Sequence, residues 1–250
     1  AVVSIGGGTH SGRSMRHAGT VIGLACDDMI AESKQRLASF LECPIDNINF
    51  ANGIFMIRST NHQFSFAEIA LNTMESQGKL KVVRQNEMHT PVYPNGTAIC
   101  EVEIDPKTGV LNVLRYSSVD DVGRCINPLI VHGQTHGGIV QGAGQALFEH
   151  CFVDNPSGQP LAGSLMDYGI SRAYDFPSFK TKISEVLSPT NPLGVKAGGE
   201  GGTTPALAVI VNAAVDALQD YGVEDIPMPL TPQAIWTAIQ SAQYKPNWVA

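Results

Sequence analysis

Glycine gathers in three short segments of this chain, and these segments restrict the possible folds more than any other feature. They are residues 6–14, 133–145 and 194–202. Glycine costs about 0.5–1 kcal/mol relative to alanine inside regular structure, so such clusters indicate close approach of the backbone to something. Two of the segments lead directly into predicted helices, whose N-termini suit anionic ligands. Plain turns between packed elements are the simpler explanation of any one segment taken alone.

Composition narrows the class of protein. The 250 residues are 43 % hydrophobic and 16 % charged, which excludes a disordered chain and allows a core. The net charge of −7 argues against nucleic acid or an anionic membrane as partner. No apolar run reaches ~18–20 residues, so we expect no membrane span. The five cysteines stand singly without a CxxC pair, which predicts no metal site and reduced thiols in a cytoplasmic protein.

The first part of the chain contains four predicted elements: a strand at 1–5, a helix at 15–41, a tight hairpin at 48–57 and a short helix at 65–75. Cys43-Pro44 ends the long helix, because proline lacks an amide donor and restricts the residue before it. Asn52-Gly53 is typical of a two-residue hairpin turn. Ser65 with Glu68 three residues later predicts a capping box.

The second part alternates polar and apolar residues and then becomes helical. An antiparallel hairpin is predicted at 98–119 with its turn at 105–109, a helix at 133–150 and a strand at 180–187. A final strong helix has Thr203 or Thr204 as its cap and Gly222 just past its end. Hairpins rather than regular crossovers predict an α+β fold, with mixed sheets and packed helices. We expect one domain over 1–250, with two sublobes at about 1–95 and 96–250.

Several familiar motifs fit poorly. Residues 6–11 match G-x-G-x-x-G badly at the last position, which disfavours a nicotinamide site, and no Gly-Lys-Ser/Thr exists for a P-loop. His132 and His136 are four residues apart, but the glutamate of a zincin helix is missing between them. They are predicted to be surface or packed histidines, and no G-x-S-x-G motif supports a serine hydrolase.

Glu200, in the third glycine-rich segment, is a candidate catalytic residue. It stands between Gly199 and Gly201, just before the predicted helix that starts near Thr203. A carboxylate with no crowding side chains, facing the positive helix end, suits a general base. A solvated glutamate that helps to cap the helix explains the same pattern equally well.

Taken together, the motifs resemble the molybdenum-cofactor-binding subunit of the xanthine dehydrogenase/aldehyde oxidase/carbon monoxide dehydrogenase family. The matching segments are 8–14 (GTHSGRS), 119–128 (VDDVGRCINP), 133–134 (GQ), 140–146 (VQGAGQA) and 194–203 (GVKAGGEGGT). Their order and spacing also fit, over nearly all of the chain. The resemblance implies the C-terminal part of that subunit, the second cofactor-binding domain, either as a natural split subunit or as a fragment.

The resemblance implies roles for particular residues. Glu200 matches the family's catalytic base, which takes the proton from a Mo–OH whose oxygen attacks the substrate. The molybdenum is held by the dithiolene of a pterin, so no side chain is expected as a metal ligand. The residues implied to bind or surround this cofactor are Ser11, Gly12, Arg13, Ser14, Asn127, Gln134, Gln141, Gly142, Lys196 and Gly199. Many members have Gly-Glu-Ala-Gly where this chain has Gly-Glu-Gly-Gly at 199–202, which predicts a looser loop.

The resemblance also implies a reaction and partners. The expected enzyme is a molybdenum hydroxylase that adds water-derived oxygen to an aldehyde or N-heteroaromatic carbon of a small-molecule substrate. Its cofactor is molybdopterin in the cytosine dinucleotide form. Electrons leave through [2Fe-2S] clusters and FAD on an Fe-S subunit and an FAD subunit, and the N-terminal portion of the molybdenum subunit completes the site. The alternatives are a carbon monoxide dehydrogenase-type subunit and a non-catalytic cofactor-binding or assembly subunit.

Overall fold

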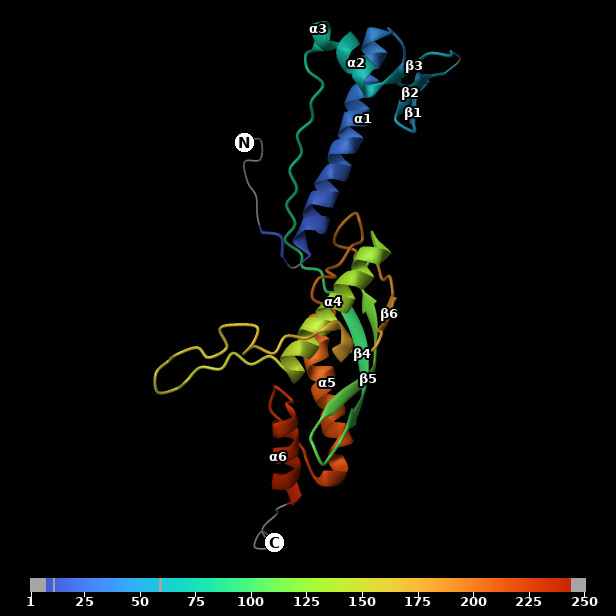
Figure 1. Ribbon diagram of the computed structural model, residues 1–250. Helices are drawn as coiled ribbons and strands as arrows, with labels where there is room; N and C mark the ends of the chain where they lie inside the picture. Colours follow the sequence, from blue (N-terminus) through green and yellow to red (C-terminus); the bar gives the residue numbers. More distant parts are fainter. Residues whose placement is uncertain (1–7, 11, 59, 244–250) are drawn as a thin grey trace. The chain divides into compact units, whose positions relative to one another are not determined.

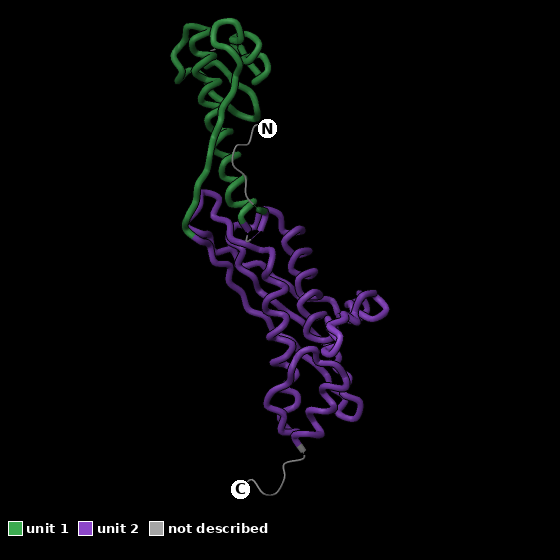
Figure 2. The backbone as a smooth tube through the Cα atoms, turned by 90° about the vertical axis from the view of Figure 1, so that its left-hand side faces the viewer, with its two compact units in different colours: residues 1–8, 13–90 green, residues 9–12, 91–250 purple. Residues whose placement is uncertain are grey.

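The structure is a computed structural model that describes residues 8–10, 12–58 and 60–243. The chain divides into two compact units, which Figure 2 colours separately. The first comprises residues 1–8 and 13–90, and the second comprises residues 9–12 and 91–250. The strand predicted at 1–5 lies outside the described residues.

A long helix and a small sheet form the first unit (Figure 1). A π-helical turn (Met15–Gly19) leads into α1 (Thr20–Phe40), which confirms the predicted long helix. The antiparallel sheet has the order β1-β2-β3 and is formed by β1 (Ile48–Ala51), β2 (Ile54–Ile57) and β3 (Gln63–Ser65). The predicted hairpin turn is confirmed, because Asn52 and Gly53 have φ of 51° and 80°.

Two short helices close the first unit. The capping box of Ser65 and Glu68 starts α2 (Phe66–Asn72), as predicted, but the helix breaks at Thr73 and resumes as α3 (Met74–Gln77). The buried Arg36 guanidinium of α1 donates hydrogen bonds to the carbonyl oxygens of Gly78 (2.7 Å) and Lys79 (3.2 Å), which ties the following segment to α1. The apolar core consists of Leu37, Ile48, Phe55, Ile57 and Ile69.

The second unit is built on a sheet with the order β4-β5-β6. The predicted hairpin is formed by β4 (Asn95–Ile104) and β5 (Leu111–Asp121), and β6 (Lys180–Ile183) is parallel to β5. The two faces of β4 alternate as expected, since Cys100, Val102 and Ile104 pack against the core while Glu101 and Glu103 are exposed. The parallel pair requires a crossover that the hairpin pattern did not predict.

Helices cover the core face of this sheet (Figure 1). Helix α4 (Pro128–Leu147) lies in the crossover from β5 to β6 and packs against α5 (Thr203–Ala217), which in turn packs on β4. The prediction started α4 near Gly133, too late because Asn127-Pro128 is itself a cap followed by a proline in the first turn. Helix α6 (Pro232–Gln243) was not predicted. The α+β class is confirmed, with one β-α-β crossover in addition to the hairpins.

Candidate functional site

The three glycine-rich segments meet in the second unit around residues 197–203. A Cβ added to Gly12, whose φ is +66°, would lie 2.7 Å from both the Cα and the Cβ of Ala197. A Cβ on Gly202 would lie 2.2 Å from the carbonyl oxygen of Thr135. Real Cβ atoms do not approach other atoms so closely. Glycine is therefore required here because the segments approach one another through their backbones.

Helix α4 presents further buried glycines to the start of α5. A Cβ on Gly138 would lie 2.9 Å from the Thr203 amide nitrogen, and one on Gly142 would lie 2.5 Å from the Thr203 carbonyl oxygen. Contact with α5 thus accounts for glycine at position 142. The binding of a cofactor by Gly142 stays a prediction.

Lys196 lies at the start of the third segment, in an ion pair with Asp121 at the end of β5. Both side chains are buried, and Asp121 Oδ1 also accepts hydrogen bonds from the backbone amides of Gly123 (2.9 Å) and Val186 (3.1 Å). Burial favours the neutral form of Asp121, but the Lys196 hydrogen bond and the two amides outweigh it. The pKa of Asp121 is therefore lower than usual.

Glu200 is exposed, while the backbone on both sides of it is held. The side-chain amide of Gln134 donates a hydrogen bond to the Gly199 carbonyl oxygen (2.9 Å). On the other side, a Cβ added to Gly201 would lie 3.4 Å from Asp120 Oδ1, so there is room for a methyl group in ordinary contact. The Glu200 carbonyl oxygen itself accepts the amide of Thr204 (3.1 Å). The side chain of Glu200 is thus exposed to solvent, while the backbone around it is held by these two hydrogen bonds.

The start of α5 differs from the prediction. Gly202, not Thr203 or Thr204, is the N-cap residue, and it makes no side-chain cap hydrogen bond. The close packing of Gly202 against Thr135 leaves the helix to begin at Thr203, and the Thr204 amide donates a hydrogen bond to the Glu200 carbonyl oxygen four residues back.

Helix α4 also has an exposed polar face. Asn127 caps the helix through Oδ1, which accepts the amide of Ile130 (3.3 Å), and Gln134 and Gln141 are exposed about two and four turns further along. A Cβ on Gly133 or Gly137 would meet no atom within 4 Å. This part of α4 combines amide side chains with backbone that an external ligand can approach closely.

Residues 11–14 are divided between different parts of the structure. Ser11 lies outside the described residues, and Gly12 belongs to the second unit beside Ala197. Arg13 and Ser14 belong to the first unit. Their proximity to the cofactor stays a prediction.

The two histidines of α4 face β6. His132 Nδ1 and His136 Nε2 lie 2.7 Å and 2.9 Å from the Thr181 hydroxyl oxygen. Both rings are partly buried, as expected of packed histidines. In the described part of the chain, no group of three His, Cys, Asp or Glu side chains could hold a metal ion.

Two buried acidic residues were not assigned a role from the sequence. Asp120 and Asp121 belong to the segment 119–128, and the structure buries both beside the Glu200 loop. The signal was two adjacent aspartates at the end of a strand, a few residues before a helix cap. Carboxylates at such a place need partners, which lie far away in the sequence.

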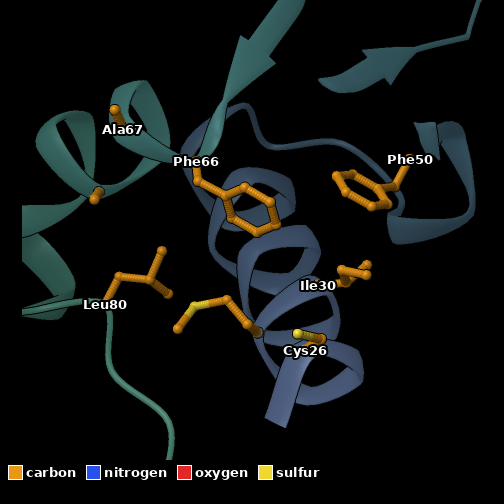
Figure 3. A pocket seen from close by; sticks show the side chains of 8 residues that line it. Cys26, Ile30, Phe50, Phe66, Ala67 and Leu80 are labelled. Carbon is orange, nitrogen blue, oxygen red and sulfur yellow. The ribbon is translucent and has the colours of Figure 1, made fainter. Parts of the chain in front are cut away.

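An apolar cavity of about 630 Å³ lies in the first unit (Figure 3). It lies between α1, β1 and α2, and its lining consists of Cys26, Met29, Ile30, Phe50, Phe66, Ala67, Ala70 and Leu80. A substrate site for proton transfer needs convergent polar groups, which this lining does not offer. The Glu200 loop is therefore the better candidate site.

Comparison with known proteins identifies the family. Residues 1–177, most of the chain, match the family described as the molybdopterin cofactor-binding domain. The chain belongs to this family. It is a molybdenum-cofactor-binding subunit or part of one, of the xanthine dehydrogenase and carbon monoxide dehydrogenase group, which confirms the resemblance seen in its motifs.

Relatives of this family match along nearly the whole chain. Subunit gamma of the 6-hydroxypseudooxynicotine dehydrogenase complex of Paenarthrobacter nicotinovorans is 34 % identical over 94 % of the chain and 30 % of its own length. Carbon monoxide dehydrogenase from Oligotropha carboxidovorans is 26 % identical with a TM-score of 0.82, over 94 % and 30 % of the two chains. Quinoline 2-oxidoreductase from Pseudomonas putida 86 is 30 % identical with a TM-score of 0.81, over 93 % and 31 %.

The chain spans less than a third of these relatives' length. The described residues fit molybdopterin, since the exposed amides of α4 can donate and accept hydrogen bonds and Gly133 and Gly137 leave room for close approach. No helix in the described ranges is long and apolar enough to cross a membrane.

Proposed function

We propose that this chain is the C-terminal, second cofactor-binding part of the molybdenum subunit of a hydroxylase. The substrate class is an aldehyde or an N-heteroaromatic compound, and the inserted oxygen comes from water. The remaining portion of the molybdenum subunit, an Fe-S subunit with [2Fe-2S] clusters and an FAD subunit are the partners, in a cytoplasmic complex. The observation that carries the proposal is an exposed Glu200 on a loop that is held by two hydrogen bonds, from Gln134 to the Gly199 carbonyl oxygen and from the Thr204 amide to the Glu200 carbonyl oxygen.

Each residue of the site has a task in this function. The cofactor, in its cytosine dinucleotide form, supplies the centre that accepts two electrons from the substrate. Asn127, Gln134 and Gln141 bind and orient it through their amides, and Gly199 and Gly12 lie in the backbone around it. A carboxylate oxygen of Glu200 takes the proton from the oxygen that attacks the substrate carbon.

Fixed placement matters because a base works only within hydrogen-bond reach of the proton it removes. Lys196 serves indirectly, since its buried ion pair with Asp121 anchors the beginning of the loop at β5. The glycines at 138, 142 and 202 hold the end of the loop against α4.

The test uses the complex purified with its natural subunits. We expect about one molybdenum per copy of the chain and release of CMP on acid treatment. Glu200→Gln should keep both and reduce the chemical step by a factor of about 10²–10⁴. The matched control is Glu103→Gln, which changes an exposed glutamate on β4 and should leave turnover unchanged.

Three results would contradict the proposal. Folded, assembled complex without molybdenum and nucleotide would exclude the cofactor. Normal turnover of Glu200→Gln at full molybdenum content would exclude this base and favour a cofactor-binding or assembly role. Reduction by carbon monoxide but by no aldehyde or N-heteroaromatic compound would move the complex to the carbon monoxide dehydrogenase type.

A further inference from the structure

Residues 79–90 of the first unit form an extended segment that runs along α1 and belongs to neither sheet (Figure 1). Arg36 of α1 contacts this segment at the Lys79 carbonyl oxygen (3.2 Å), and Arg16, just before α1, contacts it at the Thr90 carbonyl oxygen (3.1 Å). The helical residues between the two arginines cover about 30 Å. The extended segment covers this length with far fewer residues, so its backbone must be stretched like that of a β-strand.

The side chains of the extended segment alternate between two sides, as they do in a β-strand. The partly buried residues are Leu80, Val82, Asn86 and Met88. Arg84, in the same alternation, forms an ion pair with Asp28 of α1, in which Nη2 lies 2.6 Å from Oδ1. Asn86 Nδ2 donates a hydrogen bond to the carbonyl oxygen of His17 (3.4 Å). The intervening residues are all exposed: Lys79, Lys81, Val83, Gln85, Glu87 and His89.

The backbone of the extended segment has no partner strand in the described part of the chain. Within residues 8–10, 12–58 and 60–243, the amides and carbonyl groups of residues 80–89 make no hydrogen bond to another backbone group. A strand presents these groups along its two edges, and an unpaired edge is a template for another strand. No proline stands between positions 79 and 90 to block such pairing.

Apolar space lies beside the start of the extended segment. Leu80 lines the cavity of the first unit together with Phe50 and Phe66 (Figure 3). The buried core of this unit is small, and the cavity adds apolar surface that the core does not cover. Apolar surface of this kind is typical of a place where further polypeptide packs.

The rest of the molybdenum subunit is the further polypeptide that the family provides. The chain spans about 30 % of the length of its relatives, and the family match over residues 1–177 includes the extended segment. We propose that a β-strand from the remaining portion of the molybdenum subunit pairs with residues 80–89 along one edge. The inference rests on the proposed function, which it deepens by naming a surface where that portion binds.

The exposed side chains of the extended segment indicate what kind of strand fits. Residues directly opposite each other in neighbouring strands contact one another, and unlike charges or two apolar side chains are favourable there. An acidic side chain opposite Lys81 and an apolar one opposite Val83 would therefore match this segment. Main-chain hydrogen bonds would provide the affinity, as in other cases of strand addition.

Hydrogen exchange in the complex purified with its natural subunits tests the backbone pairing. Successive amides of a strand point to opposite edges, so one added strand protects every second amide. Within residues 80–89, one alternating set should exchange about 100-fold more slowly than unstructured backbone, and the other set serves as the internal control. Fast exchange of both sets in the assembled complex would overturn the inference.

Proline variants test the same contact without resolving single amides. Val82→Pro and Val83→Pro each remove one amide donor, at opposite edges of the segment, while Val82→Ala and Val83→Ala are the matched controls that keep it. At least one proline variant should melt about 2–4 °C or more below its alanine control in the complex. Equal melting of proline and alanine variants at both positions would contradict strand pairing.

Photo-crosslinking identifies the occupant. A benzoylphenylalanine in place of Val83, which is 70 % exposed, should join a peptide from the remaining portion of the molybdenum subunit. The control is the same replacement at Leu71 on α2, which is 71 % exposed and should not join that peptide. A product with a second copy of this chain, with the Fe-S subunit or with the FAD subunit would overturn the assignment of the partner.

Failure of this inference is distinguishable from failure of the proposed function. A complex with molybdenum and normal turnover, but with fast exchange throughout residues 80–89, would refute only the strand pairing. A complex without molybdenum would refute the proposed cofactor. In that complex, alternating protection and a crosslink from position 83 to the remaining portion would still support the pairing.

Discussion

The side-chain amide of Gln134 donates a hydrogen bond to the carbonyl oxygen of Gly199, although the two residues are 65 positions apart. This contact joins the exposed face of α4 to the peptide that precedes Glu200. It makes the second and third glycine-rich segments parts of one site. It also leaves the amide oxygen of Gln134 as the acceptor that can face a ligand.

Gln134→Ala should loosen the Glu200 loop. The lost hydrogen bond is worth about 0.5–1.5 kcal/mol of stability, with the exposed position favouring the lower value. Turnover should fall by about 10- to 100-fold if the base is displaced. Molybdenum content, measured in parallel, separates a displaced base from a lost cofactor. Gln145→Ala, on an exposed position of the same helix, is the control and should change neither.

The two glycines after Glu200 should respond oppositely to alanine. A Cβ on Gly202 meets the carbonyl oxygen of Thr135 at 2.2 Å and the amide nitrogen of Ile139 at 2.9 Å, and neither backbone group can move aside. Gly202→Ala should therefore lose about 1–3 kcal/mol or more. A Cβ on Gly201 makes ordinary contact, so Gly201→Ala should gain about 0.4–1 kcal/mol.

Thermal melting of the complex measures both glycine variants. Equal effects at positions 201 and 202 would contradict the packing described above. A stabilised, active Gly201→Ala would also show that the Gly-Glu-Ala-Gly form of the loop fits this chain.

Lys196→Met should destabilise the second unit strongly. It leaves the buried Asp121 carboxylate without its cation, and breaking a buried pair in this way costs about 3–5 kcal/mol. Adding Asp121→Asn should recover part of the loss. Lys182→Met, at an exposed position on β6, is the matched control and should change stability by less than about 0.5 kcal/mol. Urea unfolding of the complex measures the stability of both variants. Equal losses of stability at the two lysines would refute the role of the ion pair.

The adjacent aspartates should give opposite pH dependences. The pKa of Asp121 is lowered, so its stabilising contribution is full above the unfolded value of about 3.9 and is lost as the pH falls through the folded value. The pKa of Asp120 is raised, so its contribution is full below about 3.9 and is lost as the pH rises through the folded value.

Comparing each asparagine variant with the wild type isolates these contributions. The deficit of Asp121→Asn should shrink on acidification below about pH 4, whereas Asp120→Asn should gain on the wild type between acid and neutral pH. Melting temperatures of the complex across this range give the measurement. Curves for the two variants that run in parallel would contradict the opposite shifts.

Features formed by near neighbours in the chain were predictable from the sequence. The Ser65–Glu68 capping box, the Asn52-Gly53 turn and the alternating faces of β4 all depend on residues within a few positions of one another. The start of α4 was predictable too, since Asn127-Pro128 carries the signal of a cap. Helix α6 was missed although Pro232 stands at its first position.

The sequence by itself determined which residues the site has available: three glycine-rich segments, the amides of α4 and a glutamate between glycines. Only the tertiary structure decided what each glycine is for. Gly202 and Gly142 pack against other segments, whereas Gly133 and Gly137 stay open to a ligand. The reason is physical: glycine marks a place where a side chain is missing, and the neighbour that needs the space comes from a distant part of the chain. The same holds for Lys196 and Asp121, which are 75 positions apart and pair only once the third glycine-rich segment lies beside the end of β5.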